Sequence, residues 1–178
     1  MGYEIAGGLG VKLADPDRNV YVLCGDGSFL MASSELVTAV QERIAFTVVV
    51  FDNHEHRSIR ACQENNGFEV FGTQLRMRDK KLNSLCGDIL PIDYAKIAEG
   101  YGAVGLKAKT REELISALKQ AQEVKDKPAV IHVLIDPDRV VGNYGGWWDV
   151  PRPEVAYREE LQRQYRKYVL DKKKQIIR

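Results

Sequence analysis

The feature that most constrains this fold is a pair of strand-like segments joined by a helical one, all within residues 20–53. Residues 20–24 are apolar and strand-like, and they end abruptly at a Gly-Asp-Gly tripeptide. Residues 33–41 are typical of a helix, and residues 46–51 form a second β-branched, apolar run. A strand, a helix and a strand in this order normally make two parallel strands with a right-handed crossover. The sequence therefore predicts an α/β fold built on a mainly parallel sheet.

Polar residues follow each predicted strand at its carboxyl end. Asp26 follows the first strand and Asn53 follows the second, 27 positions later. Parallel neighbouring strands end at the same edge of a sheet, which is where open α/β sheets bind ligands. Carboxylate and amide oxygens are hard ligands of the kind that Mg²⁺ prefers, and Mg²⁺ completes its octahedron with phosphate oxygens and water. We therefore expect a site for Mg²⁺ and a phosphate group at this edge.

The glycines on either side of Asp26 support this interpretation. Gly25 and Gly27 leave room for the backbone to approach a phosphate closely. The next helix would add its N-terminal N–H groups and its positive dipole end. A Gly-Asp-Gly tripeptide alone is a common turn, so the alternative is a turn without a ligand. Its position between two buried strands, paired with Asn53, makes the ligand site the favoured hypothesis.

Size and charge exclude several classes of function. A chain of 178 residues with 44% hydrophobic and 29% charged residues is ordinary for a globular domain. The net charge of +1 gives no electrostatic reason to expect nucleic acid or a membrane surface as a partner. No apolar run is long enough to span a membrane, and no signal peptide is evident. The three cysteines lack metal-ligand spacing, which favours a reducing cytoplasm.

The two ends of the chain suggest how it is divided. Residues 1–14 are typical of a helix, and an α/β domain rarely opens with a helix on its ligand-binding edge. Glycines within residues 7–10 resemble part of a dinucleotide fingerprint, but they lack a preceding strand. From residue 153 onward the chain predicts a charged helix. We therefore predict a ligand-binding domain at residues 1–152 and a helical tail at residues 153–178.

The middle of the chain supplies further elements. Residues 60–90 are polar and predict a long loop with a short helix, either covering a site or lying on the surface. Helices are predicted near residues 93–100 and 110–124, capped by Asp93 and Thr110. Strands are predicted near residues 104–108 and 129–135, and His132 is expected to be packed in the core or at the strand end. His54 and His56 flank an acid, but a zinc site is disfavoured because no cysteine lies at ligand spacing. A segment with two tryptophans, residues 142–150, either closes over a ligand, docks on a partner or anchors the tail.

The Gly-Asp-Gly tripeptide and the Asp-Asn pair together resemble the diphosphate and Mg²⁺ motif of thiamine diphosphate (ThDP) enzymes. The resemblance covers nearly the whole chain, as the C-terminal, diphosphate-binding domain of these enzymes. Residues 1–14 resemble the helix after the first strand of that domain, which implies that this strand is missing; the alternative is that Met1 is only an initiator. The resemblance implies a three-layer, doubly wound, mainly parallel sheet of the ThDP-binding fold. It also implies ligands. The cofactor would contact Met1, Gly25, Asp26, Gly27, Ser28 and Asn53, and the metal would bind Asp26, Asn53 and the backbone carbonyl of Glu55.

Three stretches are similar to the inositol-catabolic hydrolases that open a trihydroxycyclohexane-1,2-dione ring: residues 1–12, 71–74 and 144–150. The loop at residues 54–57 is more charged than expected of these hydrolases. The resemblance implies hydrolysis or lysis of a carbon–carbon bond in a small-molecule substrate. Alternatives are an acetolactate synthase-like or decarboxylating ThDP enzyme, or a non-catalytic nucleotide-binding scaffold.

The resemblance also implies partners. In these enzymes the glutamate that activates the cofactor comes from a separate pyrimidine-binding domain, across a subunit interface. We therefore expect this chain to anchor the cofactor, to need a pyrimidine-binding domain or subunit, and to form a homo-oligomer. We expect it to be inactive by itself, with no nucleic-acid or membrane partner.

Overall fold

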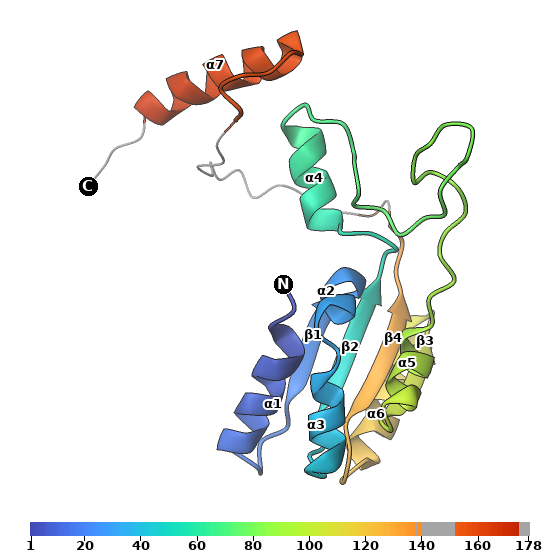
Figure 1. Ribbon diagram of the computed structural model, residues 1–178. Helices are drawn as coiled ribbons and strands as arrows, with labels where there is room; N and C mark the ends of the chain where they lie inside the picture. Colours follow the sequence, from blue (N-terminus) through green and yellow to red (C-terminus); the bar gives the residue numbers. More distant parts are fainter. Residues whose placement is uncertain (138, 140–151, 175–178) are drawn as a thin grey trace. The chain divides into compact units, whose positions relative to one another are not determined.

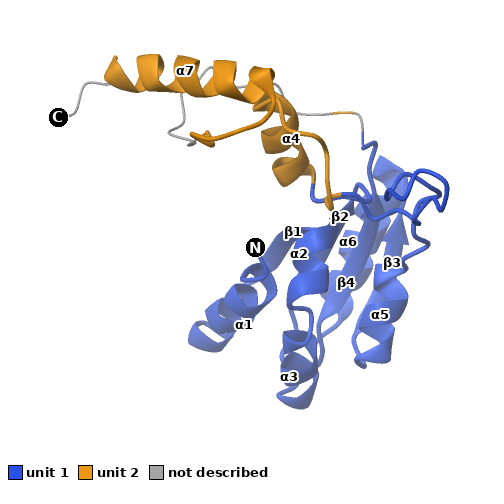
Figure 2. Ribbon diagram, turned by 45° about the horizontal axis from the view of Figure 1, so that its top comes forward, with its two compact units in different colours: residues 1–56, 74–137 blue, residues 57–73, 138–178 orange. Residues whose placement is uncertain are grey.

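The computed structural model describes residues 1–137, 139 and 152–174 (Figure 1). The chain divides into two compact units, coloured separately in Figure 2. Unit 1 comprises residues 1–56 and 74–137, and unit 2 comprises residues 57–73 and 138–178. The predicted tryptophan segment, residues 142–150, lies outside the described residues.

Unit 1 is built on a four-stranded sheet. The strands are β1 (Tyr21–Gly25), β2 (Thr47–Asp52), β3 (Val104–Ala108) and β4 (Ala129–Leu134). Their order is β1-β2-β4-β3, and every pair is parallel. In the register, Cys24 lies beside Val50, and Val50 lies beside His132. The strands predicted near residues 104–108 and 129–135 are therefore confirmed, as is the crossover between the first two.

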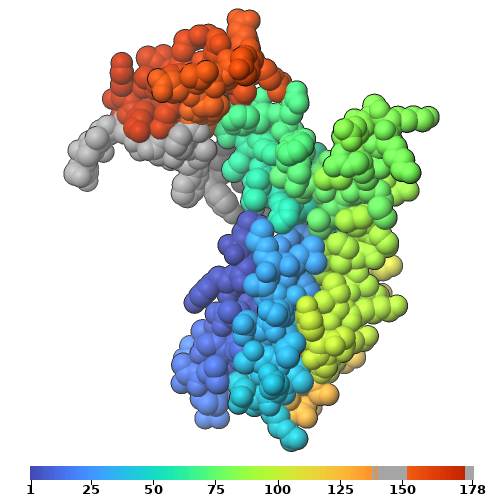
Figure 3. Space-filling model, in the orientation of Figure 1, coloured from blue at the N-terminus to red at the C-terminus, as the bar shows by residue number. Residues whose placement is uncertain are grey.

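Helices cover both faces of this sheet. On one face lie α1 (Glu4–Ala14), α2 (Asp26–Met31), α3 (Glu35–Gln41) and α5 (Tyr94–Gly100), and on the other lies α6 (Arg111–Glu123) (Figure 1). In the space-filling view, helices α1, α3 and α5 form most of the surface in front of the sheet (Figure 3). This is the three-layer α/β arrangement that the sequence predicted. Helix α2 was not expected, because its six residues are too few to show a helical period.

Two helices begin at the capping residues expected from the sequence. Asp93 precedes α5, and its side chain accepts a hydrogen bond from the Lys96 amide at 3.2 Å. Thr110 precedes α6, and its hydroxyl accepts one from the Glu113 amide at 3.2 Å. Each cap satisfies one of the amides that a helix leaves without an intrahelical partner.

The two faces of the sheet bury separate apolar cores, because successive side chains of a strand point to opposite faces. One core contains Val22, Cys24, Val48, Val50 and Val130 with Phe29 and Tyr94 from the helices. The other contains Val49, Ile131 and Val133 with alanines of α6. On this second face Leu23 is 63% exposed, because α6 packs mainly on β3 and β4.

Unit 2 contains α4 (Arg57–Asn65) and α7 (Glu159–Lys173). The short helix predicted within residues 60–90 is α4, and a helix in the predicted C-terminal tail is α7. Leu161 of α7 is buried, and α7 approaches Gly67 closely. The domain boundary at residue 152 stays a prediction. Among the described residues, no helix combines the length and the apolar character needed to cross a membrane.

Candidate metal and diphosphate site

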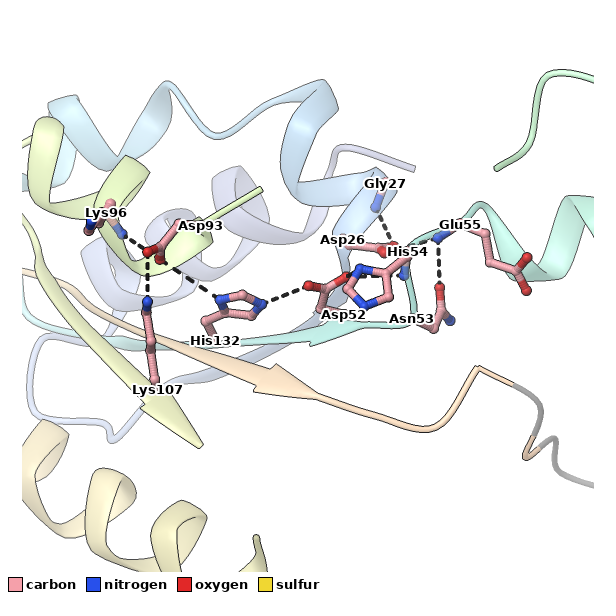
Figure 4. A network of polar contacts seen from close by, with 10 residues as sticks. All are labelled: Asp26, Gly27, Asp52, Asn53, His54, Glu55, Asp93, Lys96, Lys107 and His132. Carbon is pink, nitrogen blue, oxygen red and sulfur yellow. Dashed lines mark hydrogen bonds and ion pairs between the residues drawn. The ribbon is translucent and has the colours of Figure 1, made fainter. Parts of the chain in front are cut away.

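Asp26 and Asn53 meet at the carboxyl edge of the sheet, as predicted. Asp26 is the first residue of α2, directly after β1, and Asn53 directly follows β2. Asp26 Oδ2 accepts a hydrogen bond from the Glu55 amide at 3.1 Å, and Asn53 Oδ1 accepts one from the same amide at 3.2 Å (Figure 4). Both side chains therefore direct an oxygen toward the same amide nitrogen, which places the two predicted ligands around one point of this edge.

Asp26 is an unusual carboxyl group. Only 1% of its surface is exposed, and its second oxygen accepts a hydrogen bond from the Gly27 amide at 2.7 Å. Burial, together with a hydrogen bond to Asp52 and the charge of that carboxylate, raises the pKa of Asp26 to about 7. A bound divalent cation would supply the opposite charge that this carboxylate lacks.

Asp52 is the hub of the surrounding network. Its Oδ1 accepts hydrogen bonds from the His54 amide at 3.0 Å and from His54 Nδ1 at 2.9 Å. Its Oδ2 lies 2.7 Å from His132 Nε2 (Figure 4). Burial raises the pKa of Asp52, but the hydrogen bonds from His132 and Asp26 and the nearby His54 outweigh it and hold that pKa below its usual range. Asp52 is therefore an ionised acceptor, so His132 Nε2 and His54 Nδ1 carry the protons.

The turn after β2 is held by these hydrogen bonds. His54 has a φ of 60°, a conformation that residues other than glycine rarely adopt. The His54 carbonyl accepts a hydrogen bond from the Leu75 amide at 2.9 Å, which ties the turn to the following loop. This left-handed turn brings the Glu55 amide back toward Asp26.

The two glycines of the tripeptide have different surroundings. A Cβ at Gly27 would lie 2.3 Å from His56 Nδ1, so only glycine allows the imidazole to pack there. A Cβ at Gly25 would meet nothing within 4 Å. The open space at Gly25 is therefore where a bound group could approach the backbone.

His132 is held firmly from its other side. The Tyr94 ring lies edge-on to the imidazole with centroids 5.0 Å apart, and Phe29 packs on Tyr94 at 5.5 Å. His132 Nδ1 lies 4.0 Å from Asp93 Oδ1, and the other oxygen of Asp93 binds Lys107 Nζ at 2.6 Å. The prediction that His132 is a packed residue is confirmed, because it is only 6% exposed.

The remaining predicted site residues are less constrained. Glu55 is buried, and its carbonyl belongs to the turn beside Asp26. Ser28 is half-buried in α2, and Met1 is 62% exposed at the start of the chain. Cofactor contacts by Met1, Gly25 and Ser28 stay predictions.

The donor set fits Mg²⁺ better than a transition metal. Within residues 1–137, 139 and 152–174, no group of three or more His, Cys, Asp or Glu side chains is placed to hold a metal ion. One carboxylate, one amide and one carbonyl are all oxygen donors, and they leave coordination positions for phosphate and water. The buried Asp26, with its raised pKa, is the charged member of this set.

Sequence reasoning missed Asp52 and His132 as members of the site. The position of Asp52 could have been predicted, because alternate residues of a strand point to the same face. Asp52 therefore shares a face with Val48 and Val50, which belong to the first core. Of the six residues of β4, only His132 is polar. Their pairing could not be read from the sequence, since it depends on which strands are neighbours.

A family model and the curated relatives of this chain agree on one protein family. Residues 1–133 match the family described as "Thiamine pyrophosphate enzyme, C-terminal TPP binding domain". The 3D-(3,5/4)-trihydroxycyclohexane-1,2-dione hydrolase of Geobacillus thermodenitrificans is 45% identical over 170 residues, which cover 93% of this chain and 26% of the relative. The Bacillus subtilis protein of the same name is 42% identical over 165 residues, covering 93% and 25%. The chain thus spans about a quarter of the length of the curated relatives that it matches.

Solved structures give the same fold. A thiamine diphosphate-dependent 4-hydroxybenzoylformate decarboxylase of Rhodococcus jostii matches with a TM-score of 0.65 and 29% identity, covering 78% of this chain and 24% of that one. Benzoylformate decarboxylase from Polynucleobacter necessarius matches with a TM-score of 0.60 and 27% identity, covering 76% and 23%. Unit 1, in which the sheet lies between two layers of helices, therefore has a ThDP-binding fold.

Proposed function

Because the chain belongs to the thiamine pyrophosphate enzymes, as their C-terminal TPP-binding domain, we propose that Asp26, Asn53 and the Glu55 carbonyl bind Mg²⁺ and, through it, the diphosphate of ThDP. The observation that carries this assignment is the Glu55 amide shared by Asp26 and Asn53, at 3.1 and 3.2 Å. Two oxygens that converge on one nitrogen can also converge on one cation. Gly25, Gly27, Ser28 and Met1 complete the cofactor contacts in this proposal.

The residues of this chain act by binding and orientation. When bound, ThDP would supply a nucleophilic carbon and an electron sink for carbon–carbon cleavage next to a carbonyl group. Asp26 offers the metal a carboxylate in a buried position, where an electrostatic contact is stronger than in water. Asp52, held by His132 and His54, keeps the turn that presents Asn53 in place.

We propose that the reaction is hydrolysis of a carbon–carbon bond next to a carbonyl in a trihydroxycyclohexane-1,2-dione, as part of inositol catabolism. Relatives 40–45% identical to this chain carry that hydrolase name, which supports the substrate class. The relatives are about four times as long as the matched segment. We therefore propose that a pyrimidine-binding domain or subunit supplies the activating glutamate, within a homo-oligomer, and that this chain alone does not turn over substrate.

We also propose a cytoplasmic location. Cys62 and Cys86 are exposed, free thiols, and Cys24 is a buried one. Exposed thiols persist in reducing compartments, where disulfides are rare.

Calorimetry with ThDP and Mg²⁺ tests the cofactor assignment. The protein used is the longest natural polypeptide that carries this sequence. Asp26→Asn should weaken Mg²⁺-dependent ThDP binding by on the order of 100-fold, because a charged metal ligand is replaced by a neutral one. The matched control, Asp17→Asn, changes an exposed aspartate and should leave binding unchanged. Equal affinity for both variants would refute the assignment, as would a preference for ADP or NAD over ThDP.

A second candidate function is decarboxylation of an aryl 2-keto acid. It is favoured by the likeness to two benzoylformate-type decarboxylases, at TM-scores of 0.65 and 0.60. The two functions separate when the same polypeptide is offered both substrates. The hydrolase proposal expects ring opening of the cyclic dione without release of CO₂. Release of CO₂ from benzoylformate, with the dione left intact, would favour the decarboxylase instead.

A further inference from the structure

A buried histidine lies behind the candidate metal ligands, on a strand that carries none of them. Of the six residues of β4, only His132 is polar, and it is 6% exposed. A buried polar group needs a partner, and His132 Nε2 has one in Asp52 Oδ2 at 2.7 Å. The bond joins β4 to the end of β2, since His132 lies beside Val50 in the register.

The hydrogen bond from His132 fixes one oxygen of Asp52 and leaves the other for the turn. That second oxygen accepts hydrogen bonds from both the amide and the ring of His54, at 3.0 and 2.9 Å. His54 has the left-handed φ of 60°, which a residue with a side chain adopts only with local support. If Asp52 turned to another rotamer, His54 would lose both of its hydrogen bonds to that carboxylate.

The turn sets the positions of the candidate ligands. Asn53 and Glu55 lie on either side of His54, and the Glu55 amide binds oxygens of both Asn53 and Asp26 (Figure 4). A change of φ at His54 would rotate the Glu55 peptide away from Asp26. The position of the His132 imidazole is therefore coupled to the spacing of ligands that it does not touch.

Aromatic packing makes the imidazole a rigid support. Tyr94 is fully buried and lies edge-on to His132 at 5.0 Å, and Phe29, also fully buried, lies edge-on to Tyr94 at 5.5 Å. Side chains locked by packing hold a neighbouring site more accurately than side chains on loops.

We propose that His132 is a positioning residue of the cofactor site: its hydrogen bond to Asp52 holds the 52–55 turn in the conformation that presents Asn53 and the Glu55 carbonyl beside Asp26. This inference rests on the proposed function, because it concerns the same metal. His132 is not one of the candidate ligands, and its Nε2 pairs with Asp52. Outer groups of this kind commonly change metal affinity by about 10- to 100-fold when they are removed.

The test measures Mn²⁺ binding in the presence of saturating ThDP. The electron paramagnetic resonance signal of free Mn²⁺ reports how much of the metal is bound. The longest natural polypeptide that carries this sequence is used. His132→Leu removes the donor and should weaken Mn²⁺ binding by about 10- to 100-fold. His132→Gln keeps an N–H donor at a similar distance from the backbone and should bind within about threefold of the unchanged protein, since the hydrogen bond is retained. His132→Asn, one carbon shorter, should bind as weakly as His132→Leu and replaces it if the leucine variant does not fold.

Val130→Ala is the matched control for loss of packing. Val130 is fully buried on the same strand and the same face, so this change lowers the melting temperature without touching Asp52. Its Mn²⁺ affinity should stay within about twofold of the unchanged protein, because the 52–55 turn keeps its hydrogen bonds.

The outcomes separate the inference from the proposed function. Unchanged Mn²⁺ affinity in a folded His132→Leu or His132→Asn variant would reduce His132 to a packing residue. Weak binding by His132→Gln would show that the ring, and not its hydrogen bond, matters, and would also overturn the inference. If the unchanged protein shows no ThDP-dependent Mn²⁺ binding, the proposed function itself fails.

Discussion

The two faces of the sheet are made by alternate residues of the same strands, yet they differ in chemistry. On the face covered by α1, α2, α3 and α5, the apolar series ends in the polar residues Asp26, Asp52 and His132. On the face covered by α6, the buried core is aliphatic, and the half-buried Phe51 ring packs against it. Because the strand period is two, one shift of register would exchange these faces. The buried polar residues of the candidate site therefore lie at the carboxyl end of a single face.

The difference also has an energetic side. The α6 face gains stability from apolar burial alone. The other face buries two neighbouring carboxyl groups, which raises the pKa of Asp26 to about 7. Buried charges of this kind normally cost stability, and functional sites commonly retain such a cost. The comparison predicts that substitutions on the two faces separate stability from cofactor binding.

The largest effect is expected at adjacent residues of β2 that point to opposite faces. Asp52→Ala leaves the buried donor of His132 and the partly buried donors of His54 without their acceptor. It should lower the free energy of unfolding by about 3 kcal/mol. Phe51→Leu, on the α6 face, removes only part of a half-buried ring and should cost about 1 kcal/mol. Denaturant unfolding of the two variants measures both values. Equal losses of unfolding free energy in the two variants would contradict the role of Asp52 as the shared acceptor for His132 and His54.

A smaller effect is expected from pH in the metal-free protein. The pKa of Asp26 is about 7 in the folded chain against 3.8 for an ordinary aspartate, so the folded state binds more protons between these values. Stability should therefore fall as the pH rises from about 4 to about 7, by on the order of 2 kcal/mol. Because the pKa of Asp52 is lowered, its protonation changes stability only below about pH 4. It does not affect the pH dependence between about pH 4 and about pH 7.

Thermal unfolding in EDTA at pH 5 and pH 8 checks this dependence. Asp26→Asn should remove most of it, and that variant should be the more stable protein at pH 8. A metal-free protein that is more stable at pH 8 than at pH 5 would contradict the account of Asp26.

A conservative change on the α6 face should affect stability alone. Ile131→Val deletes one buried methyl group and should cost about 1 kcal/mol. Its Mg²⁺-dependent affinity for ThDP should not change, because Ile131 points away from Asp52 and Asp26. Calorimetry on the folded variant measures the affinity. A loss of tenfold or more would show that the two faces are not independent.

The smallest effect concerns thiol reactivity. Burial, together with the charges of Glu4 and Asp26, raises the pKa of Cys24 to about 12, whereas Cys62 and Cys86 are exposed. Iodoacetamide at pH 8 should therefore modify Cys62 and Cys86 and leave Cys24 unmodified in the folded protein. Mass spectrometry of the labelled peptides gives the answer. Rapid labelling of Cys24 would contradict this expectation, and it would mean that the sheet face covered by α1, α2, α3 and α5 opens to solvent.

Much of the fold and part of the site could be predicted from the sequence. Hydrophobic runs and caps such as Asp93 and Thr110 are local signals, and they located the strands and helices. Asp26 and Asn53 could be brought together because a parallel crossover places both strand ends at one edge. Two features could not be predicted in this way. The bond between His132 and Asp52 joins residues 80 positions apart, and the left-handed turn at His54 has no glycine to mark it.

The central claim is that Asp26 and Asn53 share one metal ion that carries a diphosphate. Anomalous diffraction from crystals grown with Mn²⁺ and ThDP tests it most directly. The account predicts a single Mn²⁺ peak about 2.1 Å from Asp26, from Asn53 Oδ1 and from the Glu55 carbonyl oxygen, with diphosphate oxygens completing the coordination. A cofactor whose Mn²⁺ is bound by other residues, with Asp26 and Asn53 both still hydrogen-bonded to the Glu55 amide, would contradict it.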